Sequence, residues 1–355
     1  MTSAMNQSRH FWLVLLPVAA LLTSCTTPRP NDPRYFQAGE SVVLIGQEPS
    51  RLAFSPKPPH PVAVRSTYLP GLTETVVYSP TRDFLLDDYG QIWRTPGSRI
   101  PDFRTNILFA QVDFRHDKFP GYGNKPFFVY VDYTHSGKFQ PPPAKREFGA
   151  AMLPKTQAKL RAGEKLRIVA FGDSITAGGE ASVPKLIFWE RWADALREKY
   201  PHASIETING ATGGDATPQG LQRLQEKVLA QKPDLVLIGF GMNDNNVGGP
   251  SIEAFAANLR TMVDRIRAET GAEVVLFSAF PPNPRWHYGS PNMARYAAAT
   301  EAVAREKRCA FADVHRLWQK LAARKKPEDL LANNINHPND YGHWIYFQAF
   351  QALGL

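Results

Sequence analysis

The chain contains few cysteines and lacks both a long apolar run and a concentrated positive charge. Cys25 and Cys309 are its two cysteines in 355 residues, so at most one disulfide can form within it. The apolar stretch at residues 11–22 is shorter than the roughly 20 residues that a transmembrane helix needs. The formal net charge of +8 divides equally between the two parts of the chain on either side of residue 145, with no basic stripe of interleaved aromatic residues. The sequence thus gives no support for nucleic-acid binding or for an N-terminal membrane span.

The first 25 residues are typical of an export signal. An Arg and no acidic residue precede the apolar stretch, and Leu22-Thr23-Ser24-Cys25 follows at once. Residues 1–24 are therefore predicted to be a cleaved signal peptide. Leu-Thr-Ser-Cys resembles the lipobox of bacterial lipoproteins, in which the Cys becomes the lipidated first residue, and an ordinary signal peptide is the alternative.

That resemblance implies a lipid anchor at Cys25 that holds the protein on a membrane surface without a transmembrane helix. Thr26, rather than Asp, follows the Cys, which favours the outer membrane and the periplasm of a bacterial cell envelope. If Cys25 is lipidated, Cys309 has no disulfide partner. Cys309 is then expected to be a small buried core residue.

Proline and alternating apolar residues distinguish the first part of the mature chain. Residues 28–143 contain 17 of the 30 prolines. Within residues 107–114 every second side chain is apolar, which predicts a half-buried strand. Similar short strands are predicted at 41–45, 73–78 and 126–133. Residues 25–145 are therefore predicted to form an all-β sandwich or jelly roll that ends in a stiff, proline-rich linker at 138–146.

From Leu153 onward, predicted strands alternate with amphipathic helices. Strand-like runs occur at 166–171, 204–208, 234–240, 273–280 and 308–312. Apolar residues with helical spacing occur at 185–200, 221–228, 252–266 and 293–307. This alternation predicts an α/β domain over residues 146–355, with a five-stranded parallel sheet covered by helices.

Polar motifs follow several of these strands. Gly172-Asp173-Ser174-Ile175-Thr176 comes directly after the first strand, although a serine there is more often a helix N-cap. Asn209 to Asp215 follows the second strand, and Gly241-Met242-Asn243-Asp244 follows the third. Asn334 to Asp340 precedes what is predicted to be the last helix. Since parallel strands end at one edge of the sheet, these loops are expected to lie together there.

The four motifs resemble the blocks of the GDSL/SGNH hydrolase superfamily, and the resemblance covers residues 150–355. The matching residues are Ser174, Gly214, Asn243 and His337. The resemblance implies a flavodoxin-like three-layer fold and an esterase or lipase reaction that needs no metal or cofactor. It also implies an oxyanion hole made by the backbone N–H groups of Ser174 and Gly214 and the amide of Asn243.

Ester hydrolysis explains why these residue types occur together. Ser174 would attack the carbonyl carbon while His337 takes its proton and later gives it to the leaving alcohol. Each residue alone has a simpler explanation: Gly214 as a turn glycine, Asn243 in an Asx turn, and His337 as a surface residue before a helix. Asp173 and Asp244 are interpreted as turn residues. Trp286 and His287 could line a substrate cleft or pack within a surface loop.

One position departs from the family pattern. The family usually has Asp three residues before the catalytic His, and this chain has Asn334 there. An Asn can accept a hydrogen bond from the imidazole but carries no charge to stabilise the imidazolium. The candidates for orienting His337 are Asn334, Asp340 and a backbone carbonyl in a Ser-His dyad, with Asp313 a weaker choice.

Two functions follow from these observations. The first is a lipid-anchored hydrolase that removes acetyl or another short acyl group from a carbohydrate; a lipase or thioesterase is a less favoured variant because no long apolar lid is evident. The second is an envelope glycan-binding or scaffold protein, in which Asn334 marks a weakened site.

Overall fold

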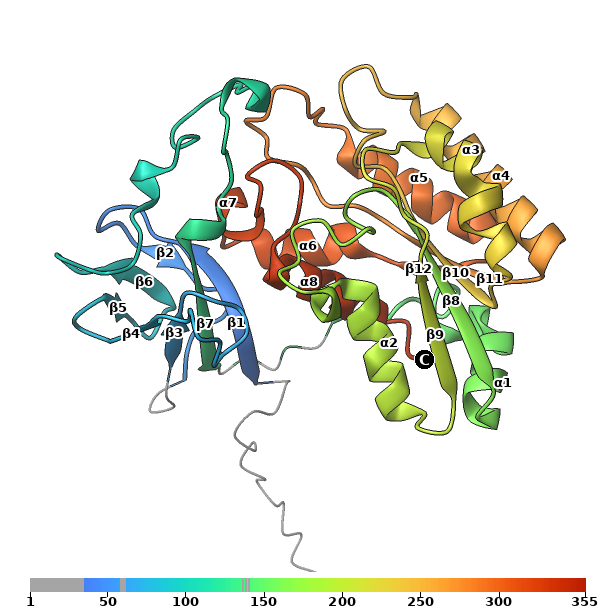
Figure 1. Ribbon diagram of the computed structural model, residues 1–355, viewed down its shortest axis with the longest axis horizontal. Coiled ribbons are helices and arrows are strands. Elements are labelled where there is room, and N and C mark those ends of the chain that lie inside the picture. The colour runs from blue at the N-terminus through green and yellow to red at the C-terminus, as the bar shows by residue number, and fades with distance from the viewer. Residues whose placement is uncertain (1–34, 58–61, 136, 138, 140) are drawn as a thin grey trace, which may run out of the picture.

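The computed structural model describes residues 35–57, 62–135, 137, 139 and 141–355. The predicted signal peptide and Cys25 lie outside these residues. Two regions lie side by side in Figure 1: a β region, residues 35–135, and an α/β region, residues 141–355. Among the described residues, no helix is both long and apolar enough to cross a membrane.

The α/β region is built on a five-stranded parallel sheet, as predicted. Its strands run in the order β12-β11-β10-β8-β9, with bounds Ala310–Ala312, Glu273–Phe277, Leu235–Gly239, Lys165–Gly172 and Ser204–Asn209. This is the flavodoxin-like order, in which the chain changes direction across the sheet beside its first strand. β8 is that first strand, so its carboxyl end lies where such sheets bind ligands.

Helices cover both faces of this sheet (Figure 1). One face carries α2 (Phe188–Lys199), α6 (Val314–Ala322) and α8 (Asp340–Gln351). The other carries α3 (Thr217–Lys227), α4 (Ile252–Thr270) and α5 (Met293–Glu306). Two helices, α1 (Pro154–Ala162) and the short α7 (Pro327–Leu330), complete the region. α1, α6 and α7 were not predicted from the sequence.

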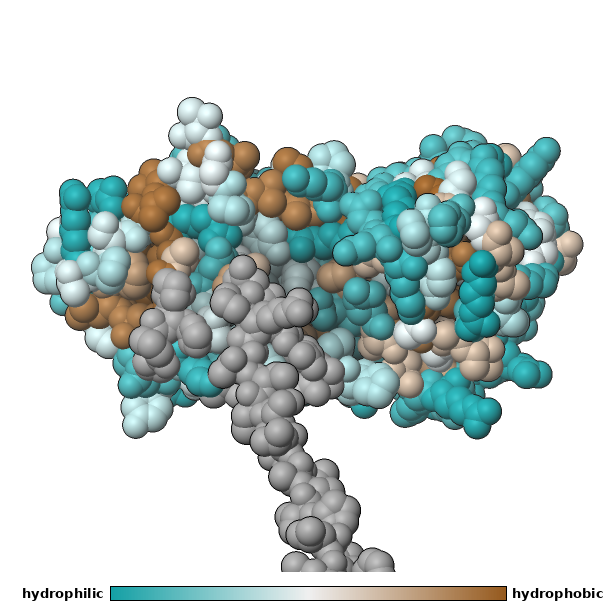
Figure 2. All heavy atoms as spheres, turned by 90° about the horizontal axis from the view of Figure 1, so that it is seen from below, coloured by the Kyte–Doolittle hydropathy of each residue, from teal (hydrophilic) through white to brown (hydrophobic). Residues whose placement is uncertain are grey.

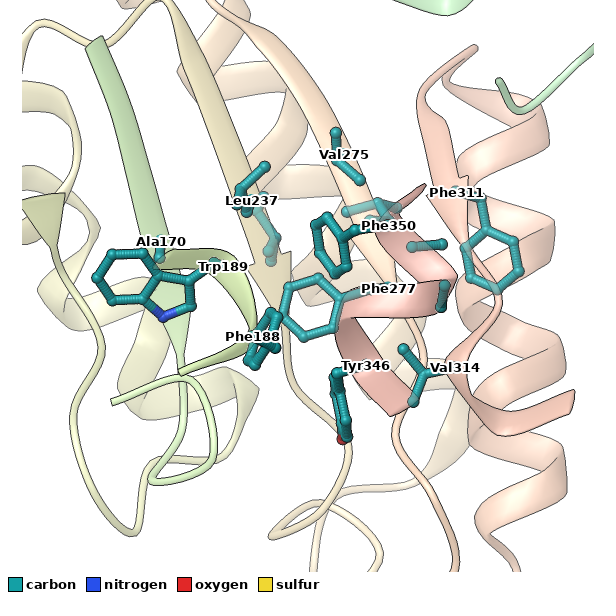
Figure 3. Close-up of a cluster of buried hydrophobic side chains, with 14 of the residues drawn as sticks. Ala170, Phe188, Trp189, Leu237, Val275, Phe277, Phe311, Val314, Tyr346 and Phe350 are labelled. Carbon is teal, nitrogen blue, oxygen red and sulfur yellow. The ribbon is translucent and has the colours of Figure 1, made fainter. Parts of the chain in front are cut away.

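Aromatic side chains attach the first of these helical layers to the sheet. Figure 3 shows Phe188 of α2 together with Tyr346 and Phe350 of α8 around Phe277 of β11. The ring centroids of Phe188 and Phe350 each lie 5.3 Å from that of Phe277. Contacts of this kind stabilise a close-packed core, so the sheet edge that carries the candidate site is firmly supported. Cys309 is fully buried beside this sheet, as expected for a core residue, and burial raises the pKa of its thiol to about 11.

The β region contains two small antiparallel sheets. One has the order β1-β7-β3-β4, with bounds Phe36–Val43, Phe128–Thr134, Ala63–Arg65 and Val77–Tyr78. The other has the order β2-β6-β5, with bounds Ser50–Arg51, Gln91–Arg94 and Phe84–Leu86. Val42 and Val129 of the first sheet share a core with Phe84 and Ile92 of the second. The region is therefore a small β-sandwich.

The prediction of a strand at residues 107–114 is wrong. The segment forms consecutive turns, with positive φ at Ala110 and Asp113, and Val112 is 77% exposed. Leu108 and Phe114 are buried against Trp286 and Ile335 of the α/β region. The apolar residues near its two ends thus anchor a loop, and their spacing imitates the alternation of a strand.

The two regions differ in how much apolar surface they leave exposed. On the face seen in Figure 2, hydrophobic surface (brown) is more prominent over the β region, and polar side chains (teal) cover most of the α/β region. Most of the large apolar side chains that remain exposed belong to the β region: Leu72, Val76, Val77, Leu85, Tyr89, Ile107 and Val112. The β region therefore leaves more of its large apolar side chains exposed than the α/β region does.

Candidate active site

Ser174 lies at the carboxyl end of β8, in the turn that the sequence indicated. Gly172 is the last residue of that strand. A side chain does not fit there, because a Cβ would lie 2.2 Å from the carbonyl oxygen of Gly239 on β10. Asp173 Oδ1 accepts the backbone N–H of Ile175 at 2.9 Å, which closes the turn. Burial raises the pKa of Asp173 to about 7. Ser174 itself is only partly buried, so its hydroxyl is accessible at the sheet edge.

His337 lies directly against this serine. Its Nε2 is 2.7 Å from Ser174 Oγ, although 163 residues separate the two positions in the chain. Asn333 Oδ1 accepts the backbone N–H groups of Ile335, Asn336 and His337 at 2.9–3.0 Å. The loop between α7 and α8 is thereby folded around one amide side chain, and it presents the imidazole to the serine.

The structure brings neither Asn334 nor Asp340 to the other side of this imidazole. Asn334 Oδ1 accepts hydrogen bonds from Asn124 Nδ2 at 3.1 Å and Asn283 Nδ2 at 3.3 Å, and its side chain is buried. Asp340 Oδ1 accepts the backbone N–H of Ser182 at 2.8 Å. Asp313 caps α6, where it accepts the N–H of Arg316. All three carboxyl or amide groups are thus used elsewhere.

The carboxylate that faces His337 is Glu180, which the sequence analysis missed. Glu180 Oε1 lies 3.9 Å from His337 Nδ1, and Glu180 Oε2 forms a 2.5 Å ion pair with Lys125 of the β region. The facing imidazole and Lys125 lower the pKa of Glu180 to about 2, against the opposing effect of its partial burial. One signal was available: Glu180 is the sole acidic residue between Ser174 and Trp189.

The loops with Gly214 and Asn243 adjoin one another beside the serine. A Cβ on Gly213 would lie 3.8 Å from Ser174 Cβ, so this loop runs past the serine, and Gly214 has a φ of +81°. Asn243 Nδ2 donates to the carbonyl oxygen of Asp215 at 2.9 Å, which ties the two loops together. Asp244 accepts the N–H groups of Thr217 and Gly241, which agrees with its interpretation as a turn residue.

A cavity of about 540 Å³ opens beside His337 between the two regions. Its α/β wall includes Glu180, Asn333 and His337, and its β wall comes from residues 105–107 and 120–127. Trp286 is not in this wall: it is 6% exposed, and its Nε1 donates to His116 Nδ1 at 3.1 Å. His287 is more exposed and pairs with Asp113. Within the described ranges, no group of three or more His, Cys, Asp or Glu side chains could hold a metal ion.

The chain is similar to known lipases and esterases. The sequence model of the GDSL-like Lipase/Acylhydrolase family matches residues 170–345. An arylesterase of Vibrio mimicus is 38% identical over 128 residues, which cover 36% of this chain and 60% of that protein. An acetylxylan esterase of Geobacillus stearothermophilus is 25% identical over 209 residues, which cover 54% of this chain and 94% of that protein.

The fold also matches a solved structure. A two-domain esterase active on acetylated mannans superposes with a TM-score of 0.50 at 23% identity, over 60% of this chain and 54% of that chain. This likeness supports the α/β fold. The present chain spans only about half of that esterase and 60% of the arylesterase.

Proposed function

Since this chain belongs to the GDSL-like lipase/acylhydrolase family, we propose that it is a serine hydrolase of carboxylic esters, with Ser174 as nucleophile and His337 as base. The observation that carries the proposal is the 2.7 Å separation of Ser174 Oγ and His337 Nε2 at the carboxyl end of β8. At this distance the imidazole can take the hydroxyl proton as the oxygen attacks.

The reaction divides into two halves. Ser174 Oγ bonds to the carbonyl carbon and its proton passes to His337 Nε2; the same proton then goes to the alcohol oxygen as the ester bond breaks. In the second half, water attacks the acyl carbon and gives a proton to His337 Nε2. That proton then passes to Ser174 Oγ as its bond to the acyl carbon breaks, which releases the carboxylic acid and restores the serine. The chain's own residues supply every proton transfer.

The oxyanion would be held by the backbone N–H groups of Ser174 and Gly214 and by the amide of Asn243. The Asn243 amide has two N–H groups, and one of them donates to Asp215. The second is available to an oxyanion. Gly214 supports the same role because a Cβ there would meet no atom within 4 Å, so its backbone is open to a ligand.

We propose acetyl or another short acyl ester of a carbohydrate as the substrate. The relative from Geobacillus stearothermophilus is named an acetylxylan esterase, and the match extends over nearly all of that protein. The cavity beside His337 is suited to a sugar because the polar Thr105 and Asn106 line it together with the aromatic Tyr122 and Phe127.

Assays of the full chain in detergent on p-nitrophenyl acetate and on acetylated xylan test this proposal. Wild type should release acetate from both substrates, and Ser174→Ala should lose at least about 10⁴-fold in kcat. Ser290→Ala, a serine whose hydroxyl bonds Asn245 at 2.7 Å, is the control and should retain activity. Equal activity of wild type and Ser174→Ala would overturn the serine mechanism. Absence of hydrolysis by wild type would favour the glycan-binding or scaffold alternative, and preference for long acyl chains would favour a lipase or thioesterase.

We also propose that the protein is anchored to the bacterial cell envelope by lipid at Cys25, with the outer membrane and periplasm favoured. Support comes from the Leu-Thr-Ser-Cys motif after a short apolar stretch. In cells fed a radiolabelled fatty acid, wild type should carry label and partition with membranes, whereas Cys25→Ala should do neither. Label on Cys25→Ala would contradict the assignment.

A further inference from the structure

We propose that Glu180 is the residue that positions His337 and that Lys125 of the β region fixes Glu180, so that the two regions complete the site together. The inference rests on the proposed function. In this chain Glu180, from the loop that follows Ser174, would take the orienting role that the family pattern assigns to position 334.

The geometry forms one continuous chain of polar groups. Ser174 Oγ lies 2.7 Å from His337 Nε2, His337 Nδ1 lies 3.9 Å from Glu180 Oε1, and Glu180 Oε2 lies 2.5 Å from Lys125 Nζ. A separation of 3.9 Å is longer than a hydrogen bond, but catalytic contacts of this kind commonly shorten when a substrate binds. Glu180 therefore occupies the place from which a carboxylate stabilises the imidazolium.

The backbone at Glu180 is strained. Glu180 has a φ of +70°, in the left-handed region that residues other than glycine rarely adopt. The preceding Gly179 donates its N–H to Ser174 O at 2.8 Å, and a Cβ on Gly179 would lie 2.8 Å from that oxygen and 3.4 Å from His337 Nδ1. Such strain persists mainly where surrounding contacts enforce it, often at functional sites.

Residue 334 is committed to another role. Asn334 has a φ of +59°, which turns the side chain toward Asn124 and Asn283, and its exposed fraction is 1%. Both contacts are donations to Asn334 Oδ1, so the oxygen that the family pattern would offer to the histidine is already occupied. The amide thus links the histidine loop to the β region.

Several charged or titratable groups surround His337 and Glu180, so each substitution in the test changes at most one charge. They are Lys125 and Tyr122 of the β region, Asp173 beside the nucleophile, Asp340 at the start of α8, and the buried His343 of the same helix. Removal of Glu180 takes away the negative charge nearest to the imidazole. Removal of Lys125 leaves that negative charge less neutralised.

The test measures kcat and kcat/KM against pH for Glu180→Gln, Glu180→Asp and Lys125→Met in the full chain. Glu180→Gln should lower kcat by about 10- to 10²-fold and move the acidic limb of the profile to lower pH, because the imidazolium loses its counter-charge. Glu180→Asp should recover part of the rate. Lys125→Met should lower kcat less and move the acidic limb to higher pH, because Glu180 then carries an unpaired charge.

Lys145→Met is the matched control. Lys145 is as exposed as Lys125, at 57% against 58%, and pairs with Glu301 at 3.0 Å, away from the site. It should change neither kcat nor the pH profile. A purely structural role for Glu180 would lower the melting temperature without moving the acidic limb.

The outcomes separate this inference from the proposed function. If wild type hydrolyses esters, Ser174→Ala does not, and Glu180→Gln retains both the rate and the acidic limb of wild type, Glu180 is not the positioning residue although the enzyme assignment stands. If Glu180→Gln with Asn334→Asp recovers the wild-type rate, position 334 is the functional one and the inference is overturned. If wild type itself hydrolyses no ester, both proposals fall.

Discussion

Ser174 and His337 meet in one site, but different parts of the molecule support them. Ser174 depends on the α/β region alone: β8 lies between β9 and β10, and the turn is closed by Asp173. His337 belongs to a segment that lies on the β region. Asn124 of the β region donates its backbone N–H to Ala332 O at 2.7 Å and its side-chain amide to Leu331 O at 2.8 Å.

Further contacts fix the same segment at its two ends. Asp329 Oδ1 accepts the backbone N–H of Val43 on β1 at 2.8 Å, and Asn339 Nδ2 donates to Ser41 Oγ at 2.9 Å. Lys325 and Glu40 form an ion pair of 2.5 Å in which both side chains are fully buried. The β region therefore supports the segment that carries His337.

This difference follows from where the two residues lie in the fold. A nucleophile on a central strand needs only the sheet, whereas a histidine in an irregular loop needs external contacts to hold its ring. In this protein the β region supplies those contacts. Substitutions in the contact between the two regions should consequently lower stability, and activity where they loosen His337, whereas substitutions at the site within the α/β region should affect activity with little loss of stability.

The largest effect on the contact between the two regions is expected from Lys325→Met. It leaves Glu40 buried without its partner, which typically costs about 3–5 kcal/mol. The free energy of unfolding from urea titration should fall by that amount. Lys307→Met, which removes a partly exposed pair with Asp264 inside the α/β region, should cost no more than about 1 kcal/mol. Equal losses in the two variants would contradict the claim that the buried pair holds the regions together.

The counterpart on the α/β side is Asn243→Ala. Loss of one oxyanion donor should lower kcat by about 10²- to 10³-fold, with a small change in melting temperature. Asn258→Ala, which removes an amide that donates to Thr217 Oγ1 at 3.1 Å, is the control and should retain kcat. A melting temperature that falls as far as in Lys325→Met, with kcat unchanged, would show that Asn243 is structural.

A smaller effect, on both quantities, is expected from Asn124→Ala. The Asn124 amide serves three acceptors around the histidine loop, including Asn334 Oδ1 at 3.1 Å, so its loss should cost about 1–3 kcal/mol of stability. We expect kcat to fall about 10-fold because His337 loses its fixed orientation. Gln91→Ala removes an amide that bonds only within the β region, to Asp87 Oδ2 at 2.9 Å, and should leave kcat unchanged.

The smallest effect concerns acid stability. The folded protein lowers the pKa of Glu180 from an ordinary 4.5 to about 2. The stability contributed by its ionised form is therefore fully present above pH 4.5 and is lost as the pH falls toward 2. The difference in melting temperature between wild type and Glu180→Gln should shrink across this interval. A constant difference would show that the pairing with Lys125 and His337 contributes nothing to stability.

The sequence allowed prediction of the parts of the fold that have regular periodicity. The runs at 166–171 and 234–240 are strands because short apolar runs suit central strands that are buried on both faces. The spacing from Ile252 to Ile266 marks a helix that buries one face. Residues 107–114 misled the same reasoning, since apolar anchors at the two ends of a loop can imitate alternation. Helix α6 escaped prediction although its apolar residues follow helical spacing.

Some residues of the site could be predicted from the sequence and others could not. Ser174 and His337 could be paired in advance because the motifs that carry them resemble two blocks of the GDSL/SGNH superfamily. The roles of Asn334 and Glu180 could not, since they depend on left-handed backbone conformations at both positions and on where Asn124 and Lys125 lie. Contacts between residues so distant in the chain leave no periodic signal.

The central claim is that the β region holds the histidine that activates Ser174. Its most direct test is the rate at which Ser174 reacts with a p-nitrophenyl phosphonate, measured by nitrophenolate release. Mass spectrometry of the labelled peptide identifies the residue that has reacted. This probe reports the nucleophile without knowledge of the natural substrate. The account predicts a single adduct on Ser174, formed about 10-fold more slowly in Asn124→Ala than in wild type or Gln91→Ala. An adduct on another residue, or equal rates in all three proteins, would contradict it.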